Sequence, residues 1–189
     1  MEEHVLPALR AWESFYVIVG TSGAALTGLM FVVITLVADN PTRSTTTAGL
    51  AAFGTPNIVH LCTVLLLSGV LSAPWHTMGH VALAIGAVGF AGICYSIIVM
   101  RRARAQDAYQ PVFEDWLWHA ALPFFAYSML LLAAVLMHLH ESTSLFTTAV
   151  VSLLLVFIAV HNAWDTVTYF AMLNLKEQAE AAAAAKPEA

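Results

Sequence analysis

The residues best suited to chemistry in this sequence are an imidazole and a carboxylate placed four residues apart. His161 and Asp165 lie in the stretch AVHNAWDTVTYF, and Asn162 follows the histidine. Residues at i and i+4 share one face of a helix, so this pair can share a proton and keep both groups satisfied in a dry environment. The spacing therefore predicts a proton-handling or polar-lining site.

Two more histidines lie within apolar stretches. His60 follows Pro56 and Asn57 by about one turn, and His119 lies just inside the end of a later stretch. Ionisable groups at membrane depth are costly unless they are paired or hydrated, which makes them functional candidates by default. We predict that they contribute to a relay or conduit, and the alternative is a set of interhelical hydrogen bonds that only locks the helices together. The predicted polar lining consists of Asp165, His161, Asn162, His60 and His119.

A second group of histidines flanks the apolar stretches. His76 and His80 are four residues apart, while His138, His140 and Glu141 follow the fourth apolar stretch. Neutral imidazole nitrogens are common ligands of transition metals, and two histidines at i, i+4 can hold one ion from a single helical face. If the two loops meet, the residues predict a Zn or Cu site. The alternative is that they are ordinary interfacial residues.

The elements that must position these groups are five long apolar stretches. The chain has 189 residues, of which 60% are hydrophobic and 10% are charged, and its mean hydropathy is +0.78. Soluble domains carry about 25% charged residues, so a soluble enzyme is excluded, and so is a disordered chain. A hydrocarbon core of about 30 Å takes about 20 helical residues to cross, and continuous apolar runs do not fit β-barrel strands. The predicted transmembrane helices cover residues 15–38, 48–71, 78–100, 116–137 and 145–172.

The basic residues predict how these helices are oriented. With five spans, six of the seven Lys and Arg residues fall on one side, opposite Arg10. They are Arg43, Arg101, Arg102, Arg104, Lys176 and Lys186. The positive-inside rule then places the amino terminus outside and the carboxyl terminus in the cytoplasm.

The predicted fold class is all-α, with one five-helix transmembrane domain in residues 1–175 and an Ala-rich cytoplasmic tail in residues 176–189. We expect a multi-pass protein of the cell membrane, specifically of a bacterial inner membrane, with the lipid bilayer as its main partner. The formal net charge of -5 argues against nucleic acid as a partner, because phosphate binding needs clustered Lys and Arg.

Small residues predict where the helices approach one another. Lipid offers little hydrophobic gain for helix association, so small residues mark contact faces. They repeat at spacings of four in the first helix and three in the third: Gly20, Ala24 and Gly28, then Gly86, Gly89 and Gly92. We predict that these two helices are central in the bundle or line a subunit interface of a homo-oligomer.

The sequence lacks the familiar local motifs of catalysis. It contains no phosphate-binding glycine loop, no HExxH helix and no GxSxG elbow, so whether it is an enzyme stays open. The leading hypothesis is a small channel or transporter-like bundle for a proton, ion or small solute. One alternative is a metal-binding membrane protein or enzyme that uses the flanking histidines. A structural or accessory membrane subunit is the third.

Overall fold

In the computed structural model the described residues are 6–38, 46–104 and 113–184, and all regular structure within these ranges is helical. The all-α prediction is therefore confirmed for this part of the chain. The elements are α1 (Pro7–Arg10), α2 (Glu13–Ala38), α3 (Thr46–Ser72), α4 (Met78–Arg104), α5 (Phe113–Trp116), a π-helix η1 (Leu117–Ala121), α6 (Leu122–Leu136) and α7 (Glu141–Ala184).

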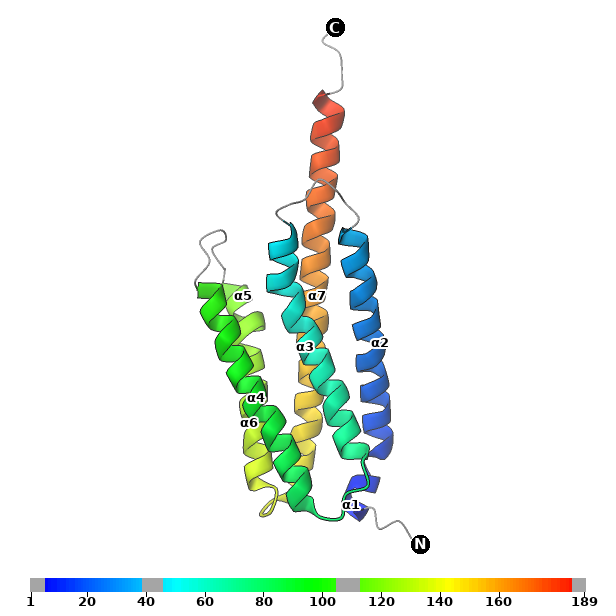
Figure 1. Cartoon of the computed structure of the whole chain (residues 1–189), viewed down its shortest axis with the longest axis vertical. Coiled ribbons are helices and arrows are strands. Elements are labelled where there is room, and N and C mark those ends of the chain that lie inside the picture. The colour runs from blue at the N-terminus through cyan, green and yellow to red at the C-terminus, as the bar shows by residue number, and fades with distance from the viewer. Residues whose placement is uncertain (1–5, 39–45, 105–112, 185–189) are drawn as a thin grey trace.

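Five of these helical segments are long and apolar enough to cross a membrane. They are Glu13–Val32, Thr55–Ser72, Met78–Arg102, Leu117–Leu136 and Glu141–Thr168. The predicted number of spans agrees with this finding, but some bounds differ. The last helix begins four residues earlier than predicted and continues through most of the Ala-rich segment, because alanine is the strongest helix former. This final part of α7 stands clear of the other helices (Figure 1).

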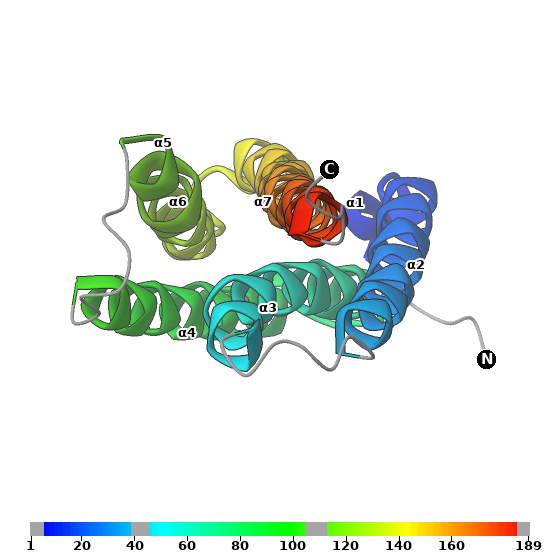
Figure 2. The same ribbon diagram turned by 90° about the horizontal axis from the view of Figure 1, so that it is seen from above.

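The helices form two layers, with α2, α3 and α4 in one and α6 and α7 in the other (Figure 2). The centre of the bundle is formed by α3 and α7. Half of the α7 span is buried inside the protein, against 22% of the α4 span. In this single chain the first and third spans are therefore not central, and the alternative, that they line a subunit interface, stays a prediction. The physical reason is that their glycines bring each of these helices close to one neighbour, which makes two tight pairs.

In the first of these pairs, α4 lies against α6. A Cβ added at Gly89 would lie 2.8 Å from the backbone nitrogen of Leu131, and one at Gly86 would lie 3.3 Å from the Ala134 Cβ. A Cβ at Gly92 would overlap the ring of Tyr127. These three glycines are the predicted packing residues of this helix, and each faces α6.

In the second pair, α2 packs on α3 through a different set of residues from the one predicted. A Cβ at Gly20 would lie 2.7 Å from the Ser68 Cβ, and one at Gly23 would lie 3.4 Å from the Leu61 carbonyl oxygen. Ala24 is exposed, and a Cβ at Gly28 would meet no atom within 4 Å. Contact therefore follows a spacing of three from Gly20, and Ala24 and Gly28 face away from this chain.

The Gly89→Ala variant tests how tightly α4 is held. Because the nearest atoms belong to the α6 backbone, they cannot rotate away, and the helices must separate. We expect the free energy of unfolding to fall by about 1–3 kcal/mol, as for other overpacked sites. The matched control is Gly28→Ala, which adds the same methyl group in open space and is expected to be neutral or slightly stabilising. Thermal unfolding in detergent measures both, and equal stabilities for the two variants would contradict this packing.

The half of the bundle near α1 has an apolar core. Its fully buried members include Val64, Leu67, Ile85, Leu130 and Leu155. The hydroxyl groups of Thr148 and Ser152 in this half donate to carbonyl oxygens one turn earlier in their own helix, each at 2.8 Å. Polar side chains from different helices meet in the other half, nearer the far end of α7.

Candidate functional site

The first element of the polar half is a π-helical turn. Proline has no N–H to donate, so Pro123 cannot bond the carbonyl oxygen of His119 as an α-helix requires. The chain instead widens into η1, and the Leu122 N–H bonds the carbonyl oxygen of Leu117, five residues earlier. Such π-turns frequently occur at functional sites. This π-turn connects α5 to α6 and carries Trp118 and His119.

A hydrogen-bonded group of three side chains joins α3 to α6. The Nδ1 atom of His60 lies 2.9 Å from the hydroxyl oxygen of Tyr127, and that oxygen lies 3.2 Å from Oγ1 of Thr63. His60 is 2% exposed. Its ring is therefore held within the bundle, and it lies close enough to His119 for the two to interact electrostatically.

Two buried amides lie near this group, one on each central helix. Asn57 and Asn162 are both completely buried. Asn162 donates from Nδ2 to the Trp118 carbonyl oxygen at 3.4 Å, but its Oδ1 has no partner among the described residues. Within the same part of the chain, neither Oδ1 nor Nδ2 of Asn57 has one. Buried amide atoms are nearly always hydrogen-bonded in folded proteins, so these three atoms are candidates for bonding to water or another small polar molecule.

Apolar packing keeps the two amides at one level of the bundle. Leu61 of α3 and Ala159 of α7 share a small buried cluster, and Ile58 and Ala163 pack against it. Asn57 and Asn162 each directly adjoin one of these packed residues in sequence. The polar site therefore lies where α3 crosses α7.

His161 and Asp165 lie together at the edge of the bundle, where the imidazole is partly buried and the carboxylate is exposed. The Nδ1 of His161 is 3.3 Å from Oδ2 of Asp165, and the imidazole stacks on Trp118 with ring centroids 3.7 Å apart. The Asp165 side chain is 53% exposed. The predicted polar lining thus separates into two parts: His60 and Asn162 are buried inside the bundle and His119 is partly buried, while the His161–Asp165 pair lies at its edge, with His161 partly buried and Asp165 exposed.

Replacing Asp165 tests how much this outer pair matters. An exposed ion pair is worth about 0–1 kcal/mol, so Asp165→Asn is expected to lower the free energy of unfolding by less than about 1 kcal/mol. The stacking of His161 on Trp118 does not depend on the carboxylate and is expected to persist. Thermal unfolding of the purified protein checks this, and a loss of several kcal/mol would mean that the carboxylate supports the bundle itself.

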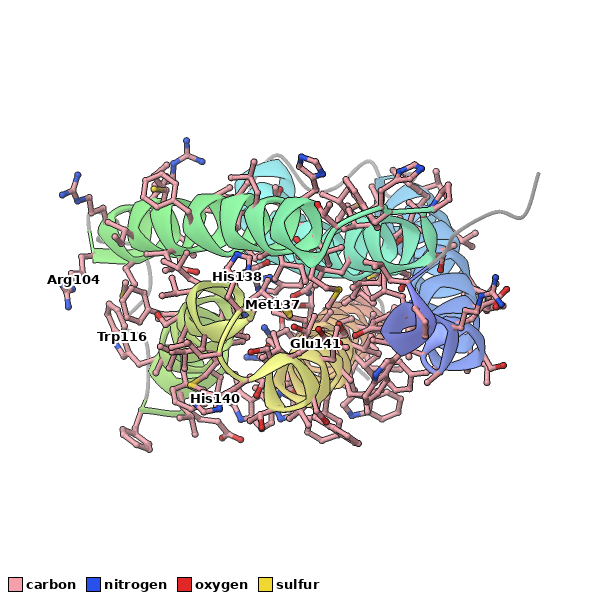
Figure 3. All side chains as sticks on the ribbon, turned by 90° about the horizontal axis from the view of Figure 1, so that it is seen from below. Arg104, Trp116, Met137, His138, His140 and Glu141 are labelled. Carbon is pink, nitrogen blue, oxygen red and sulfur yellow. The ribbon has the colours of Figure 1, made fainter. Side chains whose placement is uncertain are left out.

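The histidines predicted to bind metal do not converge. His80 Nδ1 bonds the hydroxyl of Thr77 at 2.9 Å, while His138 lies over Gly79. Figure 3 shows His138 and His140 on opposite sides of the turn between α6 and α7. In the described ranges no three His, Cys, Asp or Glu residues are grouped to hold a metal ion, so the Zn or Cu site finds no support.

Two further residues named in that hypothesis have other surroundings. His76 is exposed in the turn between α3 and α4. Glu141, at the first turn of α7, borders an open groove of about 550 Å³ whose other walls include Trp12 and Phe15.

The sequence reasoning missed Tyr127, Thr63 and the central role of Asn57. Tyr127 is one turn beyond Pro123, and a tyrosine inside an otherwise apolar helix needs a partner for its hydroxyl group. This need for a hydrogen-bond partner was the feature of the sequence that could have pointed to Tyr127. The partner itself lies on another helix and cannot be identified from spacing.

No protein-family model, curated protein or solved structure matches this chain.

Proposed function

We propose that this protein is a polytopic membrane protein whose five apolar helices span the bilayer, with the amino terminus outside and the carboxyl terminus in the cytoplasm. Arg101, Arg102 and Arg104 end α4, and Lys176 lies in the far part of α7, at the end of the bundle opposite α1 and Arg10 (Figure 1). This separation of basic residues supports the proposed orientation, since cytoplasmic loops carry an excess of Lys and Arg.

Helix geometry then gives the depth of the polar groups. At a rise of about 1.5 Å per residue, His60 is about 18 Å along α3 from Ser72, which is near the middle of a hydrocarbon core of about 30 Å. Asp165 is about 36 Å along α7 from Glu141, near the far end of the apolar segment Glu141–Thr168. His60 is thus near the middle of its span, while Asp165 lies close to the end of its own.

Within this framework the bundle moves a proton or a small polar species through its interior. The observation that carries this proposal is the set of completely or almost completely buried polar residues Asn57, His60 and Asn162, whose amides retain unpartnered atoms. A site that served only to lock helices would pair these atoms with one another. Because the half of the bundle near α1 is filled by apolar side chains, the site is closed toward that end in this conformation.

The experiment is a flux measurement on purified full-length protein in liposomes. Imposed gradients of protons, of Na⁺ or K⁺, and of small neutral solutes are followed separately and compared with protein-free liposomes. Flux of any one species above the protein-free level supports transport. If none of the species moves, the accessory or structural alternative replaces this proposal.

A homo-oligomer remains a prediction. Ala24 and Gly28 are exposed on α2, on a face that this chain leaves uncovered. Chemical crosslinking in membranes, followed by electrophoresis, measures the oligomeric state directly.

A further inference from the structure

If every close contact around His60 is a hydrogen bond, the donors and acceptors can be assigned in only one way. The Oγ1 of Thr63 lies 2.8 Å from the carbonyl oxygen of Val59, one turn earlier, and donates its single hydrogen there. Its contact with Tyr127 therefore requires the tyrosine hydroxyl to be the donor. That uses the one hydrogen of Tyr127, so His60 must donate from Nδ1 to the tyrosine oxygen.

This order of donors determines the state of the imidazole. A neutral histidine carries one hydrogen, and here it lies on Nδ1, which leaves the lone pair of Nε2 as the group that can accept a proton. The chain of donors ends at the carbonyl oxygen of Val59, which has no proton to pass on. Tyr127 and Thr63 therefore position the ring and do not conduct protons away from it.

The surroundings of His60 favour a proton over other charged species. In the described part of the chain, His60 bonds Tyr127 of α6, which contacts Thr63 and has Tyr95 of α4 nearby, and the His60 ring interacts with His119 of η1. Asn57 lies about one turn before His60 on α3, and Asn162 is buried on α7. None of these groups bears a permanent charge. A dehydrated metal cation or an anion would therefore lack a counter-charge, which is expensive in a dry interior.

The unpartnered amide atoms supply the missing part of such a site. The Asn57 side chain can both donate and accept, and the free Oδ1 of Asn162 can accept. Ordered water typically forms about three hydrogen bonds to groups of this kind. Water at this crossing of α3 and α7 would bring protons to the ring.

From these contacts we propose that the species handled by the buried site is a proton, and that His60 carries it on Nε2 while Tyr127 and Thr63 hold Nδ1–H in place. A hydrated proton transfers to Nε2 and leaves neutral water behind, which gives an imidazolium that donates from both nitrogens. Release is the reverse transfer from Nε2 to water. This inference names the substrate of the proposed transport function and rests on it, and it implies that access to Nε2 changes from one side of the bundle to the other.

The experiment is nitrogen NMR of full-length protein labelled with ¹⁵N-histidine in lipid bilayers, with the His60 signals identified by their loss in His60→Gln. We expect neutral His60 to be protonated on Nδ1, and addition of acid, but not of Na⁺ or K⁺, to convert it to the imidazolium. A neutral ring protonated on Nε2 in the unmodified protein would overturn the inference.

Two variants test the positioning chain by different routes. Tyr127→Phe removes the acceptor for Nδ1–H, and Thr63→Val removes the acceptor for the tyrosine hydroxyl, which then turns to donate to Nδ1. Both are expected to shift neutral His60 toward the form protonated on Nε2, whereas Tyr95→Phe leaves the signals unchanged. If neither variant shifts the tautomer, the chain does not position the ring, and the inference fails.

This readout separates the inference from the function on which it rests. Protonation of Nδ1 as expected, without flux of any species in liposomes, would reject transport but keep the assigned tautomer. Flux of Na⁺ or of a neutral solute, with His60 protonated on Nε2, would keep transport and reject the proton as its substrate.

Discussion

Liposomes that contain the His60→Gln variant are expected to conduct protons no faster than protein-free liposomes. Glutamine keeps a polar side chain that can bond Tyr127, so the contact between α3 and α6 is largely preserved. It has no nitrogen that accepts a proton in the physiological range, so the carrier is lost. The measurement is the decay of an imposed pH gradient, read with a pH-sensitive dye enclosed in the liposomes.

The matched control is His76→Gln, which makes the same chemical change at an exposed position between α3 and α4. This variant is expected to retain the flux of the unmodified protein. Thermal unfolding of both proteins checks that the comparison is made on folded material. Proton flux that persists undiminished in folded His60→Gln would show that His60 does not carry the proton.

The sequence predicted the number of helices and their chemistry better than it predicted their neighbours. Length and hydropathy are local properties, and the five apolar stretches reappear as helices in the structure. Periodicity also places residues on faces correctly: His161 and Asp165 do lie together on α7. It does not say whether a face points inward, and this one lies at the edge of the bundle, while Asn162, one residue away, takes the fully buried position.

The partnership of His60 with Tyr127 shows the same limit for the site. These residues are 67 positions apart, and they meet only because Gly92 leaves room for the tyrosine ring beside α4. The π-turn before Pro123 adds a local irregularity that shifts the register of His119 relative to a regular helix. A contact that depends on a neighbouring helix and on a widened turn cannot be derived from the spacing of polar residues alone.

The buried amides connect stability with function in a way that can be tested. Polar atoms that lack protein partners in the interior do not stabilise the fold, and each such atom left without water as well would cost about 1–3 kcal/mol. Residues of this kind are retained where activity requires them. Asn57 shows this most clearly, since both polar atoms of its buried side chain lack a partner in the described part of the chain.

The Asn57→Leu variant is therefore expected to lose proton flux while its stability is unchanged or rises by about 1 kcal/mol. Leucine has a similar branched shape, and replacing a polar group and its water by an apolar side chain is often neutral or stabilising.

The matched control is Ser68→Ala, which removes another buried, unpartnered polar atom from α3, but in the apolar half of the bundle. This control is expected to be stable and to keep its flux, because Ser68 lies about two helical turns from the proposed proton carrier His60 along α3. Thermal unfolding and dye-monitored flux are measured on both. If Asn57→Leu instead lowers the free energy of unfolding by more than about 2 kcal/mol, the amide is a structural link between helices, as a fully bonded buried group would be, and hydration of this site is refuted.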